Sequence, residues 1–352
     1  MVADQNEFAL RRERLALRAL INNHSTALVD TALENTALVD TALENTALEN
    51  IDIGNFAAAR AGSTLWISAT PIAQADRQVS ALAAALAWQT RSQRTGHAVE
   101  HIRICDTVAP GVTARRAAYF SLSIDVLDTR SAPAVAAAPT PHEQVIAPHP
   151  DHLAFMSMLS EAGTEVVIEH GVVAGEVLGL EVARVVDEDG VAKLRIGVGA
   201  HDREMFKMLH GDVSTIEQLQ KVVNTVRKHR ELGAPTHPLN LLAVERAARS
   251  RAVMAPQSLG LVSLQPVEPP SARPNLKDAW PCCAIGTDAD STPTVVVFVS
   301  GVDLEAVPFA ADARDRLAPA GRLLIVTQQR NVVPLQKQIA ELLAQPAEFL
   351  SA

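Results

Sequence analysis

The first half of the chain alternates apolar runs of strand length with stretches of helical periodicity. The runs at 64–69, 99–105 and 122–127 predict strands, and the segments at 72–93 and 113–120 predict the helices between them. This alternation is typical of a mostly parallel sheet covered by helices. We therefore expect an α/β domain over residues 55–130.

A second domain, of α+β type, is predicted over residues 151–264. Its pattern predicts a helix at 151–162, strands at 165–171, 177–186 and 192–199, and helices from 202, at 214–230 and at 238–253. The DEDG turn at 187–190 is expected to join the last two strands as a hairpin, because Asp and Gly tolerate the left-handed backbone of tight turns. Ser214 and Glu217 have the spacing of a helix capping box.

Residues 294–352 have the pattern of a C-terminal βαβα unit, with strands at 294–299 and 322–327 that are each followed by a helix. Two proline-rich stretches separate the three predicted units: a Pro/Ala-rich linker at 131–150 and a connection at 265–293, where Cys282 and Cys283 are expected in a loop. The chain as a whole predicts an α/β protein. Its mostly parallel or mixed sheets would be covered by helices, in two to three units joined by Pro-rich linkers.

The N-terminal region, residues 1–54, combines a helix with a repeat tract. Apolar residues near helical spacing predict an amphipathic helix at 5–22. Residues 26–50 then read as five consecutive units of TALVD or TALEN. A period of five builds no single apolar stripe on a helix, and on a strand it sends successive leucines to opposite faces.

A five-residue period suits a four-sided coil, and residues 26–50 resemble the pentapeptide-repeat proteins, in which the central leucine points inward. The resemblance implies a right-handed β-helix for this tract. A tandem expansion of a helix or of a linker is the alternative, and no function follows from the resemblance.

Composition narrows the classes of function. The net charge is −9 at pH 7 and aromatic residues make up 3% of the chain, which disfavours nucleic-acid binding along the whole chain because that needs positive charge or stacking surfaces. The three cysteines are too few for a disulfide framework or a zinc site. The N-terminus lacks the pattern of a signal peptide, and no stretch approaches the ~20 apolar residues of a membrane span. We expect a cytoplasmic protein without a membrane partner or a cofactor.

The best candidate for catalysis is the segment at 197–212, where a predicted strand runs into a helix. Such junctions gather backbone donors and polar side chains in α/β folds. His201, Asp202 and Glu204 are the candidate catalytic residues, as an acid and base pair or as metal ligands. A structural interpretation accounts for the same segment, with Asp202 capping the helix and Gly211 ending it.

A metal-assisted phosphodiester hydrolase, similar to a nuclease, is the alternative function. Glu176, Glu181 and Asp202 would then hold Mg²⁺. Sites of this kind commonly place a lysine two residues after the second carboxylate, where this chain has Ala183. Because no catalytic motif is complete, the sequence leaves open whether the protein is an enzyme.

The leading hypothesis is a binding or interaction protein that uses a basic helical face at 221–251. Between Lys193 and Arg251 there are 11 Lys or Arg against 6 Asp or Glu, in a chain that is acidic overall. On a shared face these cations would attract a phosphate-bearing ligand or an acidic protein surface. The candidate binding residues are Lys221, Arg227, Lys228, Arg230, Arg246 and Arg249.

Overall fold

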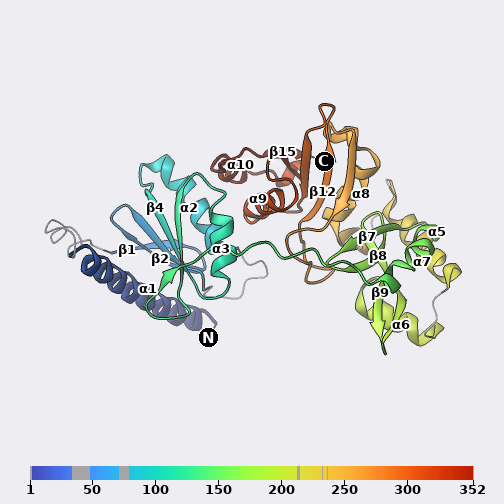
Figure 1. Cartoon of the computed structure of the whole chain (residues 1–352), viewed down its shortest axis with the longest axis horizontal. Helices are drawn as coiled ribbons and strands as arrows, with labels where there is room; N and C mark the ends of the chain where they lie inside the picture. The colour runs from blue at the N-terminus through green and yellow to red at the C-terminus, as the bar shows by residue number, and fades with distance from the viewer. Residues whose placement is uncertain are drawn as a thin grey trace. The chain divides into compact units, whose positions relative to one another are not determined.

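The computed structural model describes residues 2–33, 48–70, 79–211, 215–231, 233–235 and 237–351, and shows an α/β protein. The chain divides into two compact units (Figure 1). Unit 1 comprises Met1–Pro141, Asp303–Asp312 and Val333–Pro346, and unit 2 comprises His142–Val302, Ala313–Val332 and Ala347–Ala352. Each unit therefore takes its residues from more than one part of the sequence.

Unit 1 contains a mixed sheet with the strand order β1-β2-β3-β4-β5-β6. The three strands β3, β4 and β5 are parallel, whereas β1, β2 and β6 join antiparallel. The predicted parallel core is thus confirmed, and strands that the pattern did not predict extend it at both edges. The strands are β1 (Glu49–Ile53), β2 (Phe56–Ala61), β3 (Thr64–Ser68), β4 (His101–Asp106), β5 (Ser123–Asp128) and β6 (Val135–Ala136).

Helices cover the unit 1 sheet. Alternate residues of a strand face opposite sides of the sheet, and successive residues of β3 such as Leu65, Trp66 and Ile67 are all buried, so both faces need a cover. The long helix α1 (Val2–Leu33) buries Leu17 and Ile21 against β2 and β3, at Ala57, Ala59 and Trp66. The other helices of this unit are α2 (Ala81–Thr95), α3 (Pro110–Ala117), the first part of α9 (Ala306–Leu317) and α10 (Pro334–Glu341). Helix α10 packs against α2, so a C-terminal segment completes this unit.

The repeat tract is described at its ends. Its first residues continue α1 as far as Leu33, and Asn50 lies in β1. Residues 34–47 lie outside the described residues, and with them most of the tract for which the pentapeptide-repeat resemblance implies a β-helix.

The first sheet of unit 2 is an antiparallel meander with the order β10-β9-β8-β7. Its strands are β7 (Glu165–Glu169), β8 (Val172–Val177), β9 (Leu180–Glu188) and β10 (Val191–Ile196). The predicted hairpin is confirmed, because β9 and β10 pair across Asp189 and Gly190, which have φ values of 54° and 74°. Most of the strand predicted at 177–186 lies in β9, but its predicted start is wrong. Leu178 and Gly179 also have positive φ and form a second tight turn between β8 and β9.

Several helices pack around this meander, and their apolar spacing explains which face each one buries. Leu219, Val223 and Val226 recur at helical spacing on α7 (Ile216–Arg230) and are buried against the sheet. The capping box of α7 is formed by Thr215 and Gln218 instead of the predicted Ser214 and Glu217, and Ser214 lies outside the described residues. The other helices of unit 2 in the described ranges are α4 (Pro150–Leu153), α5 (Met156–Glu161), α6 (Gly199–His210), η1 (Pro238–Leu241), α8 (Val244–Met254), η2 (Pro256–Leu259), η3 (Gln329–Asn331) and the second part of α9.

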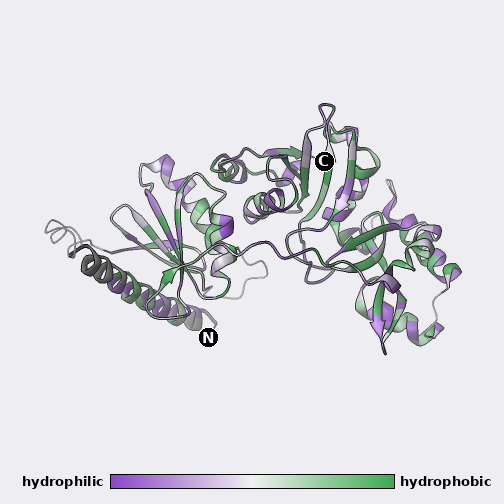
Figure 2. Cartoon of the chain, in the orientation of Figure 1, coloured by the Kyte–Doolittle hydropathy of each residue, from purple (hydrophilic) through white to green (hydrophobic). Residues whose placement is uncertain are grey.

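The second sheet of unit 2 has the order β11-β12-β13-β14-β15. Strands β13 and β14 are parallel and joined through α9, so the predicted βαβ element is confirmed. The predicted loop at Cys282 and Cys283 is wrong, because both residues lie buried in β12. The strands are β11 (Ser263–Val267), β12 (Cys282–Thr287), β13 (Pro293–Phe298), β14 (Arg322–Thr327) and β15 (Glu348–Ser351). Figure 2 shows hydrophobic residues on the central strands, while the helices carry both kinds.

None of the helices in the described ranges is long and apolar enough to cross a membrane.

Candidate functional site

The predicted junction between a strand and a helix lies at the end of β10. Helix α6 begins at Gly199, three residues after β10 ends, so His201 lies in its first turn. The candidate residues His201, Asp202 and Glu204 are exposed. The N-cap residue of α6 is Val198, without a side-chain cap, so the expectation that Asp202 caps this helix is wrong.

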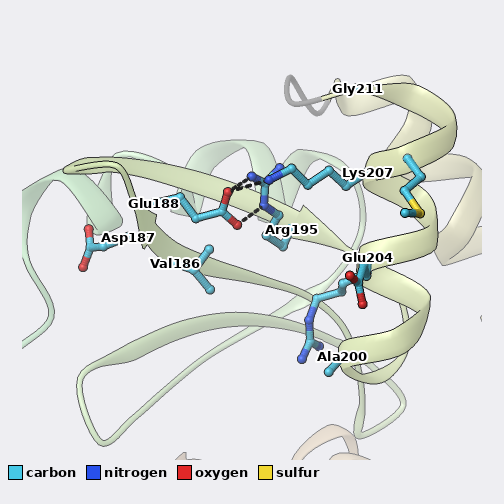
Figure 3. A pocket seen from close by; sticks show the side chains of 10 residues that line it. Val186, Asp187, Glu188, Arg195, Ala200, Glu204, Lys207 and Gly211 are labelled. Atoms are coloured by element: carbon cyan, nitrogen blue, oxygen red, sulfur yellow. Dashed lines mark hydrogen bonds and ion pairs between the residues drawn. The ribbon is translucent and has the colours of Figure 1, made fainter.

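A groove lies between this helix and the β9–β10 hairpin (Figure 3). Its volume is about 860 Å³. Apolar groups from Val186, Ala200 and Met208 line it beside several charged side chains. The charged residues of the lining are Asp187, Glu188, Arg195, Arg203, Glu204 and Lys207.

Glu188 is a carboxylate of the groove that several cations surround. Arg195 and Lys207 donate hydrogen bonds to its carboxylate, from Nε of Arg195 at 2.6 Å and from Nζ of Lys207 at 3.0 Å (Figure 3). Lys193 lies 3.9 Å from the same carboxylate. These hydrogen bonds, from Arg195 first and then Lys207, lower the pKa of Glu188 to about 2. Glu188 therefore stays ionised and holds α6 against the hairpin.

Three arginines converge on a second carboxylate, that of Glu181. Arg184 binds it through Nε and Nη2, both at 2.8 Å, and Arg203 donates from Nη1 at 2.9 Å. Nη2 of Arg273 lies 3.7 Å away. We call Arg184, Arg203 and Arg273 the arginine cluster. They come from β9, from α6 and from the segment between β11 and β12, so the fold gathers them from distant parts of the sequence.

The arginine cluster and Glu181 together carry a net positive charge. Burial favours the neutral form of Glu181, yet its hydrogen bond with Arg184 and the charges of the three arginines lower its pKa. Burial lowers the pKa of Arg203, and the charge of Arg184 lowers it further against the opposing effect of Glu181. Burial and the charge of Arg246 lower the pKa of Arg273. One carboxylate does not neutralise three guanidinium groups.

Arg273 is the least satisfied member of the arginine cluster. Its side chain is 11% exposed, and its Nη1 atom is buried without a hydrogen-bond partner among the described residues. A buried donor of this kind costs about 1–3 kcal/mol, and more when it is charged. Arg203 belongs both to the arginine cluster and to the groove lining, so the two features are continuous.

The charges of two further arginines are neutralised by two glutamates. Arg246 and Arg249 of α8 each contact both Glu169 and Glu176 of the adjoining strands. Burial favours the neutral form of Arg246, but the charges of Glu176 and Glu169 outweigh it and raise the pKa of the guanidinium. Two cations therefore meet two anions, and we call this group the paired network.

The structure does not bring the six predicted binding residues onto one exposed face. Arg246 and Arg249 are buried in the paired network, and Arg230 is buried where its guanidinium donates to backbone carbonyl groups. Arg227 donates to the carbonyl of Gly163 at 2.7 Å. Lys221 and Lys228 are exposed.

Of the carboxylates named for Mg²⁺, Glu176 and Glu181 lie opposite each other on β8 and β9, but each of them is bound to arginines. Glu176 binds Arg246 and Arg249, Glu181 binds Arg184 and Arg203, and Asp202 is exposed. The described part of the chain holds no group of three or more His, Cys, Asp or Glu residues able to bind a metal ion. These glutamates serve as counter-ions for arginine in this structure.

The three thiols are all buried and free. Burial raises the pKa of Cys105 and of Cys282 to about 12, and it raises that of Cys283 as well. Because the thiolate is the reactive form, these residues are poor nucleophiles at neutral pH.

Sequence reasoning missed the arginine cluster, although one signal for it was present. Glu181 and Arg184 interrupt the apolar run at 177–186, and a charge inside a buried strand needs a partner. The contributions of Arg203 and Arg273 could not be foreseen, because they depend on how α6 and the segment before β12 pack.

No protein family matches the chain, and neither the curated proteins nor the solved structures include a significant match to it.

Proposed function

We propose that the protein is a binding protein for an anionic ligand and that the arginine cluster is its binding site. The observation that carries the proposal is the sharing of Glu181 by three guanidinium groups, of which Arg273 keeps a buried Nη1 atom without a partner among the described residues. An oxyanion would supply the missing charge and the missing hydrogen-bond acceptor together.

The chemistry of guanidinium groups supports this assignment. Their planar donor pairs match the oxygen atoms of phosphate and carboxylate groups, and such charge-assisted hydrogen bonds are stronger than neutral ones. Arg203 also lies in the first half of α6, and the N-terminal end of a helix favours negative charge. The proposal keeps an anionic ligand, as the charge pattern predicted, and moves its site away from the face at 221–251.

Titration of the full chain with inorganic phosphate, followed by calorimetry at low ionic strength, tests the proposal. We expect phosphate to bind, and we expect Arg273→Gln to weaken binding by about 10-fold or more, because one charge-assisted hydrogen bond contributes about 1.5–3 kcal/mol. Arg251→Gln is the matched control, since Arg251 is an exposed arginine of unit 2 outside the arginine cluster.

Either of two results would overturn the proposal. The first is that the unaltered chain binds no phosphate. The second is that Arg273→Gln and Arg251→Gln weaken binding equally, which would indicate attraction by general charge instead of a built site.

A further inference from the structure

Resting on the proposed function, we infer that the ligand is a phosphomonoester of a small hydroxylated compound. Its phosphate would bind the arginine cluster, and its organic part would lie in the groove between α6 and the β9–β10 hairpin. Arg203 links the two features, because it contacts Glu181 and also lines the groove.

The charge of the arginine cluster selects the kind of phosphate. Three guanidinium groups against the carboxylate of Glu181 leave two uncompensated positive charges. The neighbouring paired network has no net charge, because its two arginines meet two glutamates. Asp202, next to Arg203, is exposed, so solvent screens its charge. A phosphomonoester carries nearly two negative charges at pH 7, whereas a diester or a carboxylate carries one.

The groove has the opposite character. Apart from Arg203, its lining holds Asp187, Glu188 and Glu204 against Arg195 and Lys207. Arg195 and Lys207 are already bound to Glu188. The exposed carboxylate of Glu204 remains as an acceptor, whereas that of Asp187 points away from α6 (Figure 3) and contacts Nε2 of His152 at 2.9 Å. Carboxylates accept hydrogen bonds, so this surface suits hydroxyl groups.

The same contrast argues against a nucleic-acid backbone. A backbone would place further phosphates along the groove, beside the carboxylates of Glu188 and Glu204 and where the cations Arg195, Lys207 and Arg203 are already bound to glutamates. Like charges brought together in this way are repelled. The volume of about 860 Å³ lies within the range of about 300–1,000 Å³ that is usual for small-ligand sites. The site therefore fits one phosphate attached to a compact polar group.

Three probes compared by calorimetry on the full chain test this inference: inorganic phosphate, ribose 5-phosphate, and a single-stranded oligonucleotide without terminal phosphates. We expect ribose 5-phosphate to bind about 10-fold more tightly than inorganic phosphate, as one or two additional hydrogen bonds would provide. The oligonucleotide is expected to bind more weakly than inorganic phosphate.

Variants locate the gain in affinity. Glu204→Gln is expected to bring the affinity for ribose 5-phosphate towards that for inorganic phosphate, because the groove loses a charged acceptor. Glu231→Gln, at an exposed glutamate beyond the groove lining, is the matched control and should leave the ratio of the two affinities unchanged.

The outcomes separate the two proposals. If none of the probes binds, the proposed function itself fails. If inorganic phosphate binds through Arg273 but ribose 5-phosphate gains nothing, or the oligonucleotide binds more tightly, the phosphomonoester inference is overturned and the anion site stands.

Discussion

At the scale of single residues, Arg249 is a buried cation with two carboxylate partners, whereas Arg273 shares one carboxylate with two other arginines. Arg249 contacts Glu169 and Glu176 and is almost fully buried. Arg273 approaches Glu181, whose carboxylate already binds two other arginines. The same residue type should therefore affect stability in opposite directions at these two positions.

We expect Arg249→Gln to destabilise the protein by about 3–5 kcal/mol, because removal of one partner leaves buried charge uncompensated. Arg273→Gln should stabilise the ligand-free protein by about 1 kcal/mol, because it removes an unsatisfied cation. Urea denaturation of both variants measures the difference. Equal destabilisation by the two would contradict the assignment of Arg273 to a ligand site.

The ion pairs of Glu188 in the groove should make the stability of the folded state depend on pH. The pKa of Glu188 is lowered to about 2 from an ordinary value of 4.5. A carboxyl group with a lowered pKa stabilises the folded state above the unfolded pKa, and this contribution is lost as pH falls through the folded pKa. The loss should therefore occur between pH 4.5 and pH 2.

We expect Glu188→Gln to melt at a lower temperature than the unaltered chain at pH 7, and the gap to close as pH is lowered through that range. Thermal melts at several pH values, with Glu231→Gln as the control, measure it. A gap that is the same at pH 7 and at pH 2.5 would show that the ion pairs with Arg195 and Lys207 do not cause the difference.

Residue identity alone did not reveal which cations are free to bind. Arg230, Arg246 and Arg249 recur in helices beside Lys221 and Lys228, yet the three arginines are buried and the two lysines are exposed. The long arginine side chain reaches carbonyl groups and carboxylates on neighbouring elements, and those partners are set by tertiary packing. Charge counts therefore did not indicate which arginines would form the proposed site.

At the scale of elements, the two tight turns of the meander behave differently although their backbones are similar. Gly179 and Gly190 have φ values of 75° and 74°. A Cβ atom at Gly190 would have open space, whereas at Gly179 it would lie 2.2 Å from the carbonyl carbon of Arg246 in α8. Gly179 is thus needed both for the turn and for the close approach of α8.

This pair separates backbone strain from crowding. Gly190→Ala should cost about 1–2 kcal/mol, the penalty of a left-handed backbone. Gly179→Ala should cost a further 1–3 kcal/mol or so, because α8 must shift. Chemical denaturation measures both, and equal costs would show that α8 yields without strain.

The elements that periodicity predicted best are those with a clear apolar face or a strong turn signal. The parallel strands β3, β4 and β5 and the hairpin at Asp189 and Gly190 are examples. Strand β12 was missed because Pro281 and the small residues beside it indicated a loop, while its burial comes from pairing with β11 and β13. The turn at Leu178 and Gly179 was missed because apolar residues flank it on both sides.

At the scale of the whole molecule, unit 1 depends on residues near the C-terminus. Asp312, which is fully buried, accepts hydrogen bonds from Nε of Arg115 at 2.8 Å, from Nε of Arg116 at 3.1 Å and from the hydroxyl of Tyr119 at 3.2 Å. The carboxylate of Glu305 accepts from the backbone N–H of Ser80 at 2.6 Å. Contacts that are distant in sequence thus close this unit.

We expect a fragment of residues 1–141 to unfold at a lower urea concentration than unit 1 in the full chain, because it lacks these carboxylates and α10. Hydrogen exchange of the amides of α2 and α3 in both proteins measures the difference. Asp312→Asn in the full chain should reproduce part of the loss, and equal protection in fragment and full chain would refute the expectation.

The sequence predicted three units that follow one another along the chain, but not that the chain passes between two units several times. Proline-rich stretches mark places where regular structure stops, and hydropathy carries no information about which segment returns to an earlier unit. The linker predicted at 131–150 illustrates this, since Val135 and Ala136 pair with β5 as strand β6.

The return of Asp303–Asp312 and Val333–Pro346 to unit 1 sets an order of events during synthesis. After residue 141 has left the ribosome, roughly 200 further residues must follow before α10 exists, a delay of about 10–40 s at 5–20 residues per second. Throughout that interval the surface of α2 that α10 covers in the folded protein stays exposed. We expect a chaperone that binds nascent chains to contact this surface.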